Sequence, residues 1–374
     1  MNIRDIRSLY IHFPFCRHLC NYCDFYKNIP KDKMKEYSSF EASLIKGYDH
    51  FFKTFKDSNY QVRSLNTLYL GGGTPSLWDK RGAEFLQNFL LDRNIELSTD
   101  CEFTLEVNPG GWTEEGIEKF REIGANRFSL GIQSLNPNFI KIIDRIHNID
   151  DVYNTLKFFN EKELSFSVDF MIGLPFSKDY GRDIVAELEE ILSFNPEHIS
   201  LYILTTKAGY IHRNHLPDED FIEREYLKVS EFLRSRGFDH YEVSNFSKPT
   251  KESRHNLKYW RSESVMALGA SATGFLKEIG TRYKWKVSDS AFSVEKLTHS
   301  EQALEQIYMA LRINKPFCLR DHVNNESKLL EVIDLWKSRK YIDFYDGERI
   351  SLNSRGFLML DSLLDDLFKY NLLD

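Results

Sequence analysis

Three cysteines near the N-terminus have the spacing of a metal-cluster loop. Cys16, Cys20 and Cys23 follow a short apolar run that ends at Pro14. Thiolates at C-x3-C-x2-C spacing can hold three corners of a cubane [4Fe-4S] cluster, and the fourth iron is then open to an added ligand. The sequence therefore predicts an oxygen-sensitive iron–sulfur cluster on these three residues.

A structural zinc ion is the alternative for this loop. Zinc requires four closed ligands, and His12 or His18 could supply the fourth. The chain has five cysteines, an odd number that favours a metal site in a reducing compartment over a disulfide framework. Cys101 and Cys318 stand alone, and each is expected to be a small packed side chain.

Polar residues also stand at the ends of successive strand-like runs. A glycine run, 71–73, follows the second strand, and Glu106, Gln133 and Asp169 end or interrupt the third, fourth and fifth. A buried polar group without a partner costs about 1–3 kcal/mol. Several such groups converging on one end of a sheet are easier to explain as contacts to a ligand than as separate hydrogen bonds in the core.

The elements that must position these residues alternate between strand and helix, which indicates parallel strands joined by crossover helices. About six such units predict a partial (β/α)6 barrel, an α/β fold whose chemistry lies on loops after the strands. The predicted strands cover residues 9–13, 67–70, 102–107, 127–131, 166–172 and 198–204. The predicted helices cover residues 34–52, 83–91, 114–123, 152–160 and 183–192.

The rest of the chain predicts two further regions. Residues 206–300 are expected to form an extension or lid over the barrel that spans residues 1–205. Residues 301–374 are expected to form a winged-helix-like domain, with helices at 301–311, 328–338 and 356–369 and a hairpin at 341–352 closed by a type I′ turn. The carboxylate-rich segment 361–366 and a net charge of -7 argue against nucleic acid as a partner.

Composition is ordinary for a soluble globular protein. It has 374 residues, 42% of them hydrophobic and 28% charged, and no apolar run near the ~18 residues that span a bilayer. No apolar segment of the signal-peptide kind precedes Cys16. We therefore expect a cytoplasmic location without a transmembrane segment. Contact with a membrane surface and assembly into a homodimer are left open.

The cysteine loop resembles that of the radical S-adenosylmethionine superfamily, and almost the whole chain is similar to its oxygen-independent coproporphyrinogen III oxidase-like family. The resemblance implies that the open iron of the cluster binds the amino and carboxylate groups of S-adenosylmethionine. It also implies that ten residues form the pocket for this cofactor: Tyr10, Tyr22, Phe25, Gly72, Gly73, Thr74, Glu106, Gln133, Arg145 and Asp169.

The chain departs from the oxidase at two places. Phe25 stands where the oxidase has a further cysteine, and little sequence precedes the first strand, so loss of coproporphyrinogen dehydrogenase activity is expected. The segment H-N-x-x-Y-W instead resembles the heme chaperone (HemW-type) branch of the family. It implies heme contacts from His255 as the axial ligand and from Asn256, Tyr259 and Trp260. The family's later glycine segment usually contains a histidine, and 268–274 has none.

These resemblances imply a heme chaperone that binds heme and passes it to a recipient hemoprotein. The alternatives are a radical enzyme that acts on porphyrins, by oxidising coproporphyrinogen III or by opening the heme ring, and a zinc-stabilised structural protein. Phe25 and His255 argue against the oxidase. A heme-degrading enzyme also needs a heme pocket, so the sequence leaves that alternative open.

Overall fold

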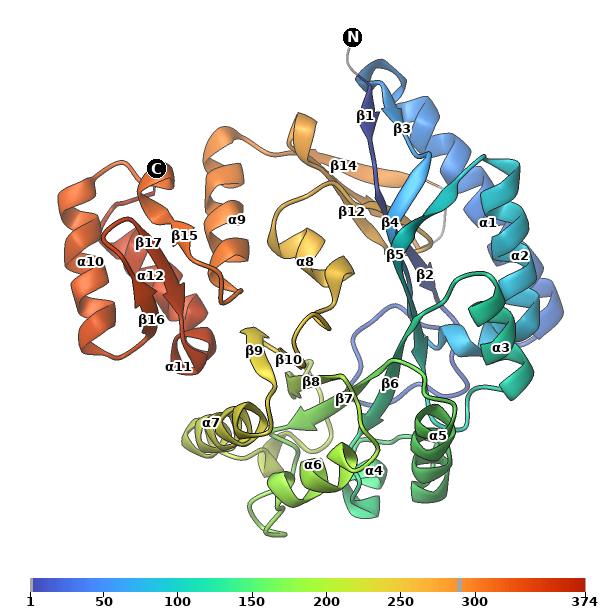
Figure 1. Ribbon diagram of the computed structural model, residues 1–374, viewed down its shortest axis with the longest axis horizontal. Helices are drawn as coiled ribbons and strands as arrows, with labels where there is room; N and C mark the ends of the chain where they lie inside the picture. Colours follow the sequence, from blue (N-terminus) through green and yellow to red (C-terminus); the bar gives the residue numbers. More distant parts are fainter. Residues whose placement is uncertain (1–2, 288–290, 374) are drawn as a thin grey trace.

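The computed structural model describes residues 3–287 and 291–373, and its main feature is a curved central sheet (Figure 1). Within those residues the sheet has nine strands, in the order β11-β2-β4-β5-β6-β7-β8-β10-β9. The strands from β2 to β8 in this order run parallel, which confirms the partial barrel. They are β2 (Ser8–Phe13), β4 (Ser64–Gly72), β5 (Glu96–Val107), β6 (Arg127–Gln133), β7 (Phe166–Ile172) and β8 (His198–Ile203).

Crossover helices cover the outer face of this sheet, and each predicted helix is confirmed. Their positions follow from apolar residues at helical spacing, as in α5, where Val152, Leu156 and Phe159 are buried. A capping box between Asn148 and Asp151 starts that helix. The helices are α1 (Lys33–Thr54), α2 (Asp79–Asp92), α3 (Glu114–Glu122), α4 (Pro137–Ile142), α5 (Ile149–Glu161) and α6 (Ile184–Leu192).

The two faces of the barrel strands differ in chemistry. On β5, Phe103 and Leu105 are fully buried in the core beneath the helices, whereas the alternating Glu102, Thr104 and Glu106 face the barrel interior. The same alternation recurs on the neighbouring strands. The barrel therefore has an apolar outer layer that holds the fold together and a polar interior that can hold a ligand.

The region from 206 to 300 contributes to the sheet at both of its edges. β10 pairs antiparallel with β8, and β11 pairs parallel with β2. The 17-residue helix α7 was not predicted, because many charged residues mask its buried stripe. The division of the chain near residues 205 and 300 stays a prediction. The elements are α7 (Glu219–Ser235), β9 (Asp239–Glu242), β10 (Asn245–Ser247), α8 (Arg254–Trp260), β11 (Met266–Leu268), β12 (Thr273–Leu276), β13 (Thr281–Trp285) and β14 (Phe292–Lys296).

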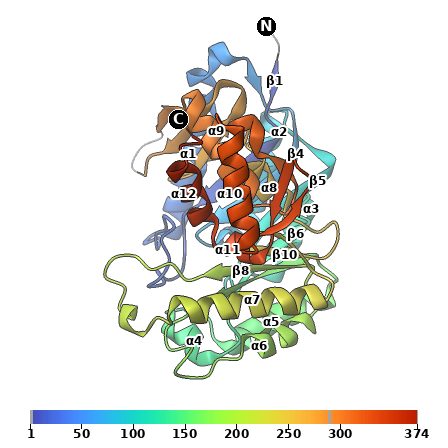
Figure 2. The same ribbon diagram turned by 90° about the vertical axis from the view of Figure 1, so that its left-hand side faces the viewer.

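The C-terminal region is winged-helix-like, as predicted, and has its own core around Trp336, Leu363 and Leu367. Figure 2 shows it in front of the barrel. The predicted type I′ turn is wrong. Such a turn needs a positive φ at both central residues, and Gly347 has a φ of 100° but Asp346 does not have a positive φ. The Asp346 carboxylate instead accepts hydrogen bonds from the backbone N–H groups of Glu348 and Arg349. The elements are α9 (His299–Leu311), β15 (Phe317–Cys318), α10 (Glu326–Ser338), β16 (Ile342–Tyr345), β17 (Arg349–Leu352), α11 (Ser354–Leu358) and α12 (Leu360–Lys369).

Short elements complete the description. β1 (Arg4–Asp5) pairs with β3 (Tyr60–Gln61), and single 3₁₀ turns lie at Lys56–Ser58, Pro75–Trp78, Arg213–His215, Lys277–Ile279 and Leu319–His322. In the part of the chain that the structure describes, no helix is long and apolar enough to cross a bilayer.

Candidate functional site

The loop after β2 brings the three clustered cysteines to one cavity. Cys16 is buried, Cys20 and Cys23 are half-buried, and all three line a space of about 60 Å³ at the carboxyl ends of the parallel strands. Their thiols are free of disulfides. Cys101, on β5, and Cys318, on β15, do not line this cavity. The fold therefore gathers the three thiols that the spacing selects.

The charges around the cavity suit an anionic thiolate cluster. Burial raises the pKa of the Cys16 and Cys20 thiols, which disfavours thiolates in the absence of a metal. Lys27 lowers the pKa of Cys16, and Arg145 lowers that of Cys20, so both cations stabilise the ionised form. A donor set of three thiols beside two cations fits the predicted cluster.

The histidines that could complete a zinc site have other partners. His12 Nδ1 lies 3.0 Å from the Tyr10 hydroxyl, and His12 Nε2 lies 2.8 Å from the carbonyl oxygen of Tyr26. His18 Nε2 lies 2.9 Å from a carboxylate oxygen of Asp144. Among the described residues, no group of three or more His, Cys, Asp or Glu side chains has the arrangement of a single-ion site.

The glycine run after β4 lies directly against the cysteine loop. A Cβ added to Gly73 would stand 2.7 Å from the carbonyl oxygen of Phe15 and 3.0 Å from Cys16 Sγ, so a side chain here would displace the loop. The Thr74 hydroxyl lies 3.6 Å from Cys16 Sγ. Gly72 adopts a φ of 112°, which favours glycine. This backbone therefore packs directly against the cysteine loop.

Two carboxylates of the barrel interior lie behind the glycine run. Glu106 accepts hydrogen bonds from the Gly72 N–H at 3.0 Å and from the Tyr69 hydroxyl at 2.9 Å. Burial, and then the charge of Asp169, raise the pKa of Glu106 to about 7. Burial also raises the pKa of Asp169, whose carboxylate accepts a hydrogen bond from Ser129 at 3.1 Å. A cationic or hydroxyl-bearing ligand would stabilise both carboxylates as anions.

Arg145 connects the cluster loop with the strand ends. Its guanidinium donates to the carbonyl oxygen of Gly131 and to Asn108 Oδ1, both at 2.7 Å, and lies 3.4 Å from the Tyr22 hydroxyl. Asn108 also donates to Thr74 at 2.7 Å. Sequence reasoning missed Asn108, although its position directly after β5, in Leu-Glu-Val-Asn-Pro, is the kind of signal that selected Glu106.

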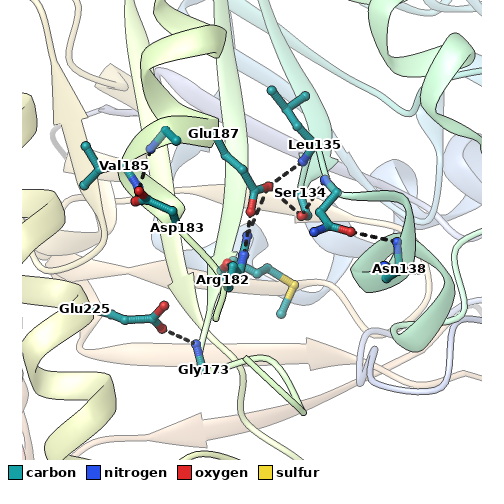
Figure 3. A network of polar contacts seen from close by, with 12 residues as sticks. Ser134, Leu135, Asn138, Gly173, Arg182, Asp183, Val185, Glu187 and Glu225 are labelled. Carbon is teal, nitrogen blue, oxygen red and sulfur yellow. Dashed lines mark hydrogen bonds and ion pairs between the residues drawn. The ribbon is translucent and has the colours of Figure 1, made fainter. Parts of the chain in front are cut away.

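The turn after β6 is fixed by a buried ion pair (Figure 3). Gln133 ends the strand with a φ of 70°, a strained conformation for a residue other than glycine. Glu187 accepts hydrogen bonds from the Ser134 hydroxyl at 2.6 Å and from the Leu135 N–H at 2.7 Å. Arg182, whose side chain is fully buried, donates to Glu187 at 2.7 Å. This pair, which the sequence did not reveal, holds the backbone that presents Gln133.

The remaining predicted cofactor residues differ in their surroundings. Tyr10 faces the barrel interior, where burial raises the pKa of its hydroxyl. Tyr22 is in contact with Arg145, and burial raises its pKa to about 12. Phe25 is 71% exposed and does not line the cysteine cavity, whereas Gly72–Thr74 and Arg145 do.

The predicted heme residues lie on α8, which packs inside the barrel. His255 is 1% exposed, its Nδ1 lies 2.8 Å from the Thr67 hydroxyl, and its Nε2 has no hydrogen-bond partner among the described residues. Burial lowers its pKa to about 3, so the ring is neutral. The rings of Tyr69 and Tyr259 lie 5.1 Å and 5.6 Å from it. Ligation of heme iron by His255 therefore requires α8 to move.

The four predicted heme residues do not converge on one point. Residues five apart on a helix point in directions about 140° apart, so His255 and Trp260 face different sides of α8. Trp260 lines a second cavity next to the C-terminal domain. Asn256 and Tyr259, which lie between His255 and Trp260 in the sequence, are half-buried. Glu102, which was not predicted, accepts hydrogen bonds from the N–H groups of Arg254 and His255 at 2.9 Å and 2.8 Å, and so holds the start of α8.

Comparison with known proteins identifies the family. The chain is 31% identical to the heme chaperone HemW of Bacillus subtilis over 332 residues, covering 82% of this chain and 83% of that protein. The chain belongs to the HemW family. It is also 29% identical to the HemW of Buchnera aphidicola subsp. Schizaphis graminum, over 96% of this chain and 97% of that protein. The HemW of Escherichia coli is 31% identical over 71% of this chain and 69% of that protein.

Two further matches agree with this membership. Residues 10–188 match the Radical SAM superfamily, and a [4Fe-4S] cluster and S-adenosylmethionine are the cofactors of this chain. The solved structure of coproporphyrinogen III oxidase (HemN) from Escherichia coli shares the fold, with a TM-score of 0.80 over 99% of this chain and 90% of that one at 18% identity. The family and the fold that the motifs implied are therefore confirmed.

Proposed function

We propose that this chain is a heme chaperone that binds heme and transfers it to a recipient hemoprotein, with the cluster and S-adenosylmethionine acting as gating cofactors. Its relatives across 71–96% of the chain are heme chaperones by name. The position of Tyr69 is the observation that supports this gating role. Its hydroxyl donates to Glu106 in the cofactor pocket, and its ring lies 5.1 Å from His255.

The residues of the cofactor pocket have separate roles in this proposal. Cys16, Cys20 and Cys23 would hold the cluster, which would supply an open iron for S-adenosylmethionine and an electron for its cleavage. Gly72, Gly73 and Thr74 provide backbone and hydroxyl contacts to the methionine end, and Tyr22 with Arg145 closes the pocket beside Cys20. Glu106, Gln133 and Asp169, with Tyr10, line the interior beneath it. Phe25, which is exposed, covers the pocket only after a local movement of its loop.

Heme binding in this proposal depends on α8. The unpartnered Nε2 of His255 is neutral and is the atom through which an imidazole coordinates heme iron. Because Tyr10, Tyr69 and Tyr259 enclose it, iron reaches this atom only when α8 withdraws from the barrel. Binding of S-adenosylmethionine at Glu106 would act on Tyr69, and through Tyr69 on His255.

Heme addition to the anaerobically reconstituted protein tests the function. Wild-type protein should show a Soret band, and heme should pass to an apo-hemoprotein on mixing. His255→Ala should shift the band and speed heme loss, whereas His299→Ala, at an exposed histidine, should do neither. With S-adenosylmethionine and a reductant, heme and coproporphyrinogen III should both stay unconverted. Accumulating protoporphyrinogen IX would identify an oxidase, and ring opening with iron release would identify a degradative enzyme.

Location and assembly are separate parts of the proposal. We place the chain in the cytoplasm, which its free cysteines support, because free thiols persist in reducing compartments. We also propose that the chain forms a homodimer and that it contacts a membrane surface. Light scattering of the reconstituted protein tests the first, and sedimentation with liposomes tests the second.

A further inference from the structure

A second cavity lies between the barrel and the C-terminal domain. It has a volume of about 320 Å³, within the range of small-molecule sites in proteins. Three distant segments line it: the end of α8 with Trp260 and Arg261, the turn after β12 with Lys277, and the stretch from the end of α9 to β15 with Ile313, Lys315 and Phe317. In Figure 1, α8 lies between the sheet and α9, as this lining requires.

The rim of this interdomain cavity is cationic. The residues Arg261, Lys277 and Lys315 are exposed, and none of them forms an ion pair with a carboxylate in residues 3–287 or 291–373. The nearest acidic residues in sequence have other partners. Glu263 pairs with Lys258 at 2.6 Å, and Glu278 accepts hydrogen bonds from Tyr60 and Ser264. Three uncompensated cations at one cavity, in a chain with a net charge of -7, indicate an anionic ligand.

The floor of the cavity is apolar and partly aromatic. Trp260 and Phe317 are half-buried, and Ile313 is buried. Arg312 lies 4.3 Å from the centre of the Trp260 ring but does not line the cavity, so it supports the ring from elsewhere. The indole N–H of Trp260 is buried and has no hydrogen-bond partner among the described residues. Because this nitrogen is closed to solvent, a ligand in the cavity would contact the ring of Trp260 and not its N–H.

We infer that the interdomain cavity binds the porphyrin ring of heme, with the ring on Trp260 and its two carboxylates on Lys277, Lys315 or Arg261. The inference rests on the proposed function and deepens it: the cavity is a second porphyrin site, on the face of α8 away from His255, which a heme occupies before or after its ligation by His255. The described lining contains no histidine, cysteine, methionine or tyrosine. Binding there therefore depends on the flat ring and its carboxylates, and not on iron.

Metal-free protoporphyrin IX is the probe that separates this cavity from axial ligation. We expect the reconstituted full-length protein to bind it, with quenching of tryptophan fluorescence that is weaker in Trp260→Phe. The double variant Lys277→Glu/Lys315→Glu should lose at least about tenfold in affinity for this probe, because two attractive charges become repulsive. The control Lys284→Glu/Lys296→Glu makes the same charge change at exposed positions outside the cavity and should stay within about twofold. Ala310→Trp, which fills the cavity from α9, should also weaken binding.

The outcomes separate the cavity from the chaperone function. His255→Ala should keep the wild-type affinity for the metal-free probe within about twofold while its heme spectrum changes. If the Lys277/Lys315 variant binds protoporphyrin IX as well as its control does, and heme still binds through His255, the cavity inference is wrong and the chaperone function stands. If wild-type protein binds neither heme nor protoporphyrin IX, the chaperone function itself fails.

Discussion

The carboxylate of Glu102 accepts a hydrogen bond from the backbone N–H of His255 at 2.8 Å, across 153 residues of sequence. It also accepts one from Arg254, so a single side chain on β5 fixes the first turn of α8 inside the barrel. Hydrogen bonds to a charged group contribute about 1.5–3 kcal/mol each. The position of the predicted axial histidine therefore depends on a residue outside the predicted heme motif.

Weakening this anchor should expose His255. In Glu102→Gln the carboxylate charge is lost while the shape is kept, so α8 should leave the barrel more often and heme should bind His255 faster. Stopped-flow measurement of the Soret change gives the rate. Glu96→Gln, at an exposed carboxylate on the same strand that forms no hydrogen bond or ion pair with α8 among the described residues, is the matched control. An unchanged heme association rate in Glu102→Gln would show that α8 does not limit access.

The cluster should depend on three cysteines and no others. Changing Cys16, Cys20 or Cys23 to Ala should abolish the roughly four iron and four sulfide per chain expected for a cubane cluster. Cys101→Ala and Cys318→Ala should retain them, because neither residue lines the cluster cavity. Iron and sulfide analysis after anaerobic reconstitution measures this. Stoichiometric zinc without sulfide would contradict the assignment.

Glu106 should make stability depend on pH. Its pKa is raised from 4.5 to about 7, so between these values the folded chain retains a proton that the unfolded chain has released. The contribution of Glu106 to stability should therefore fall as pH rises through this window, by about 3 kcal/mol in total. Glu106→Gln lacks this titration. Urea unfolding of both proteins without S-adenosylmethionine, from pH 4.5 to 8, should show wild type losing stability relative to the variant. A difference that is constant with pH would refute the raised pKa.

Breaking the Arg182–Glu187 pair should affect both stability and the cofactor pocket. Glu187→Gln leaves the buried guanidinium of Arg182 without its partner charge, which costs about 3–5 kcal/mol. It also weakens the hold on the turn that presents Gln133, so S-adenosylmethionine should bind less tightly. Chemical unfolding and equilibrium binding measure the two effects. The control is Glu189→Gln, which changes an exposed carboxylate on the same helix as Glu187 and removes the partner of Arg236. This variant should change the free energy of unfolding and the affinity for S-adenosylmethionine only slightly.

Local patterns in the sequence were sufficient for the barrel and the cysteine loop. Cys16, Cys20 and Cys23 lie within eight positions, so their spacing alone brings them to one cavity. The strands were recognised because short apolar, β-branched runs alternate with amphipathic helical runs along the sequence. The prediction missed the starts of β4 and β5 because their first residues are mostly polar. In the structure those residues pair across the two strands, as Ser64 does with Glu96.

Features that depend on contacts between distant segments could not be predicted. Glu187 is five residues from Arg182, but its other partner, Ser134, is 53 residues away. The interdomain cavity is assembled from three segments, of which the heme-like motif identified only Trp260. His255 was expected to be accessible to heme, and its enclosure follows from the anchoring of α8 by Glu102 and the packing of Tyr69, which the motif does not encode.

The pairing of β10 with β8 and of β11 with β2 has a consequence for synthesis of the protein. When the ribosome has made the first 205 residues, the parallel strands from β2 to β8 exist, yet the backbone N–H and C=O groups along the outer sides of β2 and β8 have no partners. Unpaired strand edges recruit other chains. Both edges gain their partners only when residues 245–268 emerge, so the nascent barrel passes through a long interval in which it is open to aggregation and in need of protection.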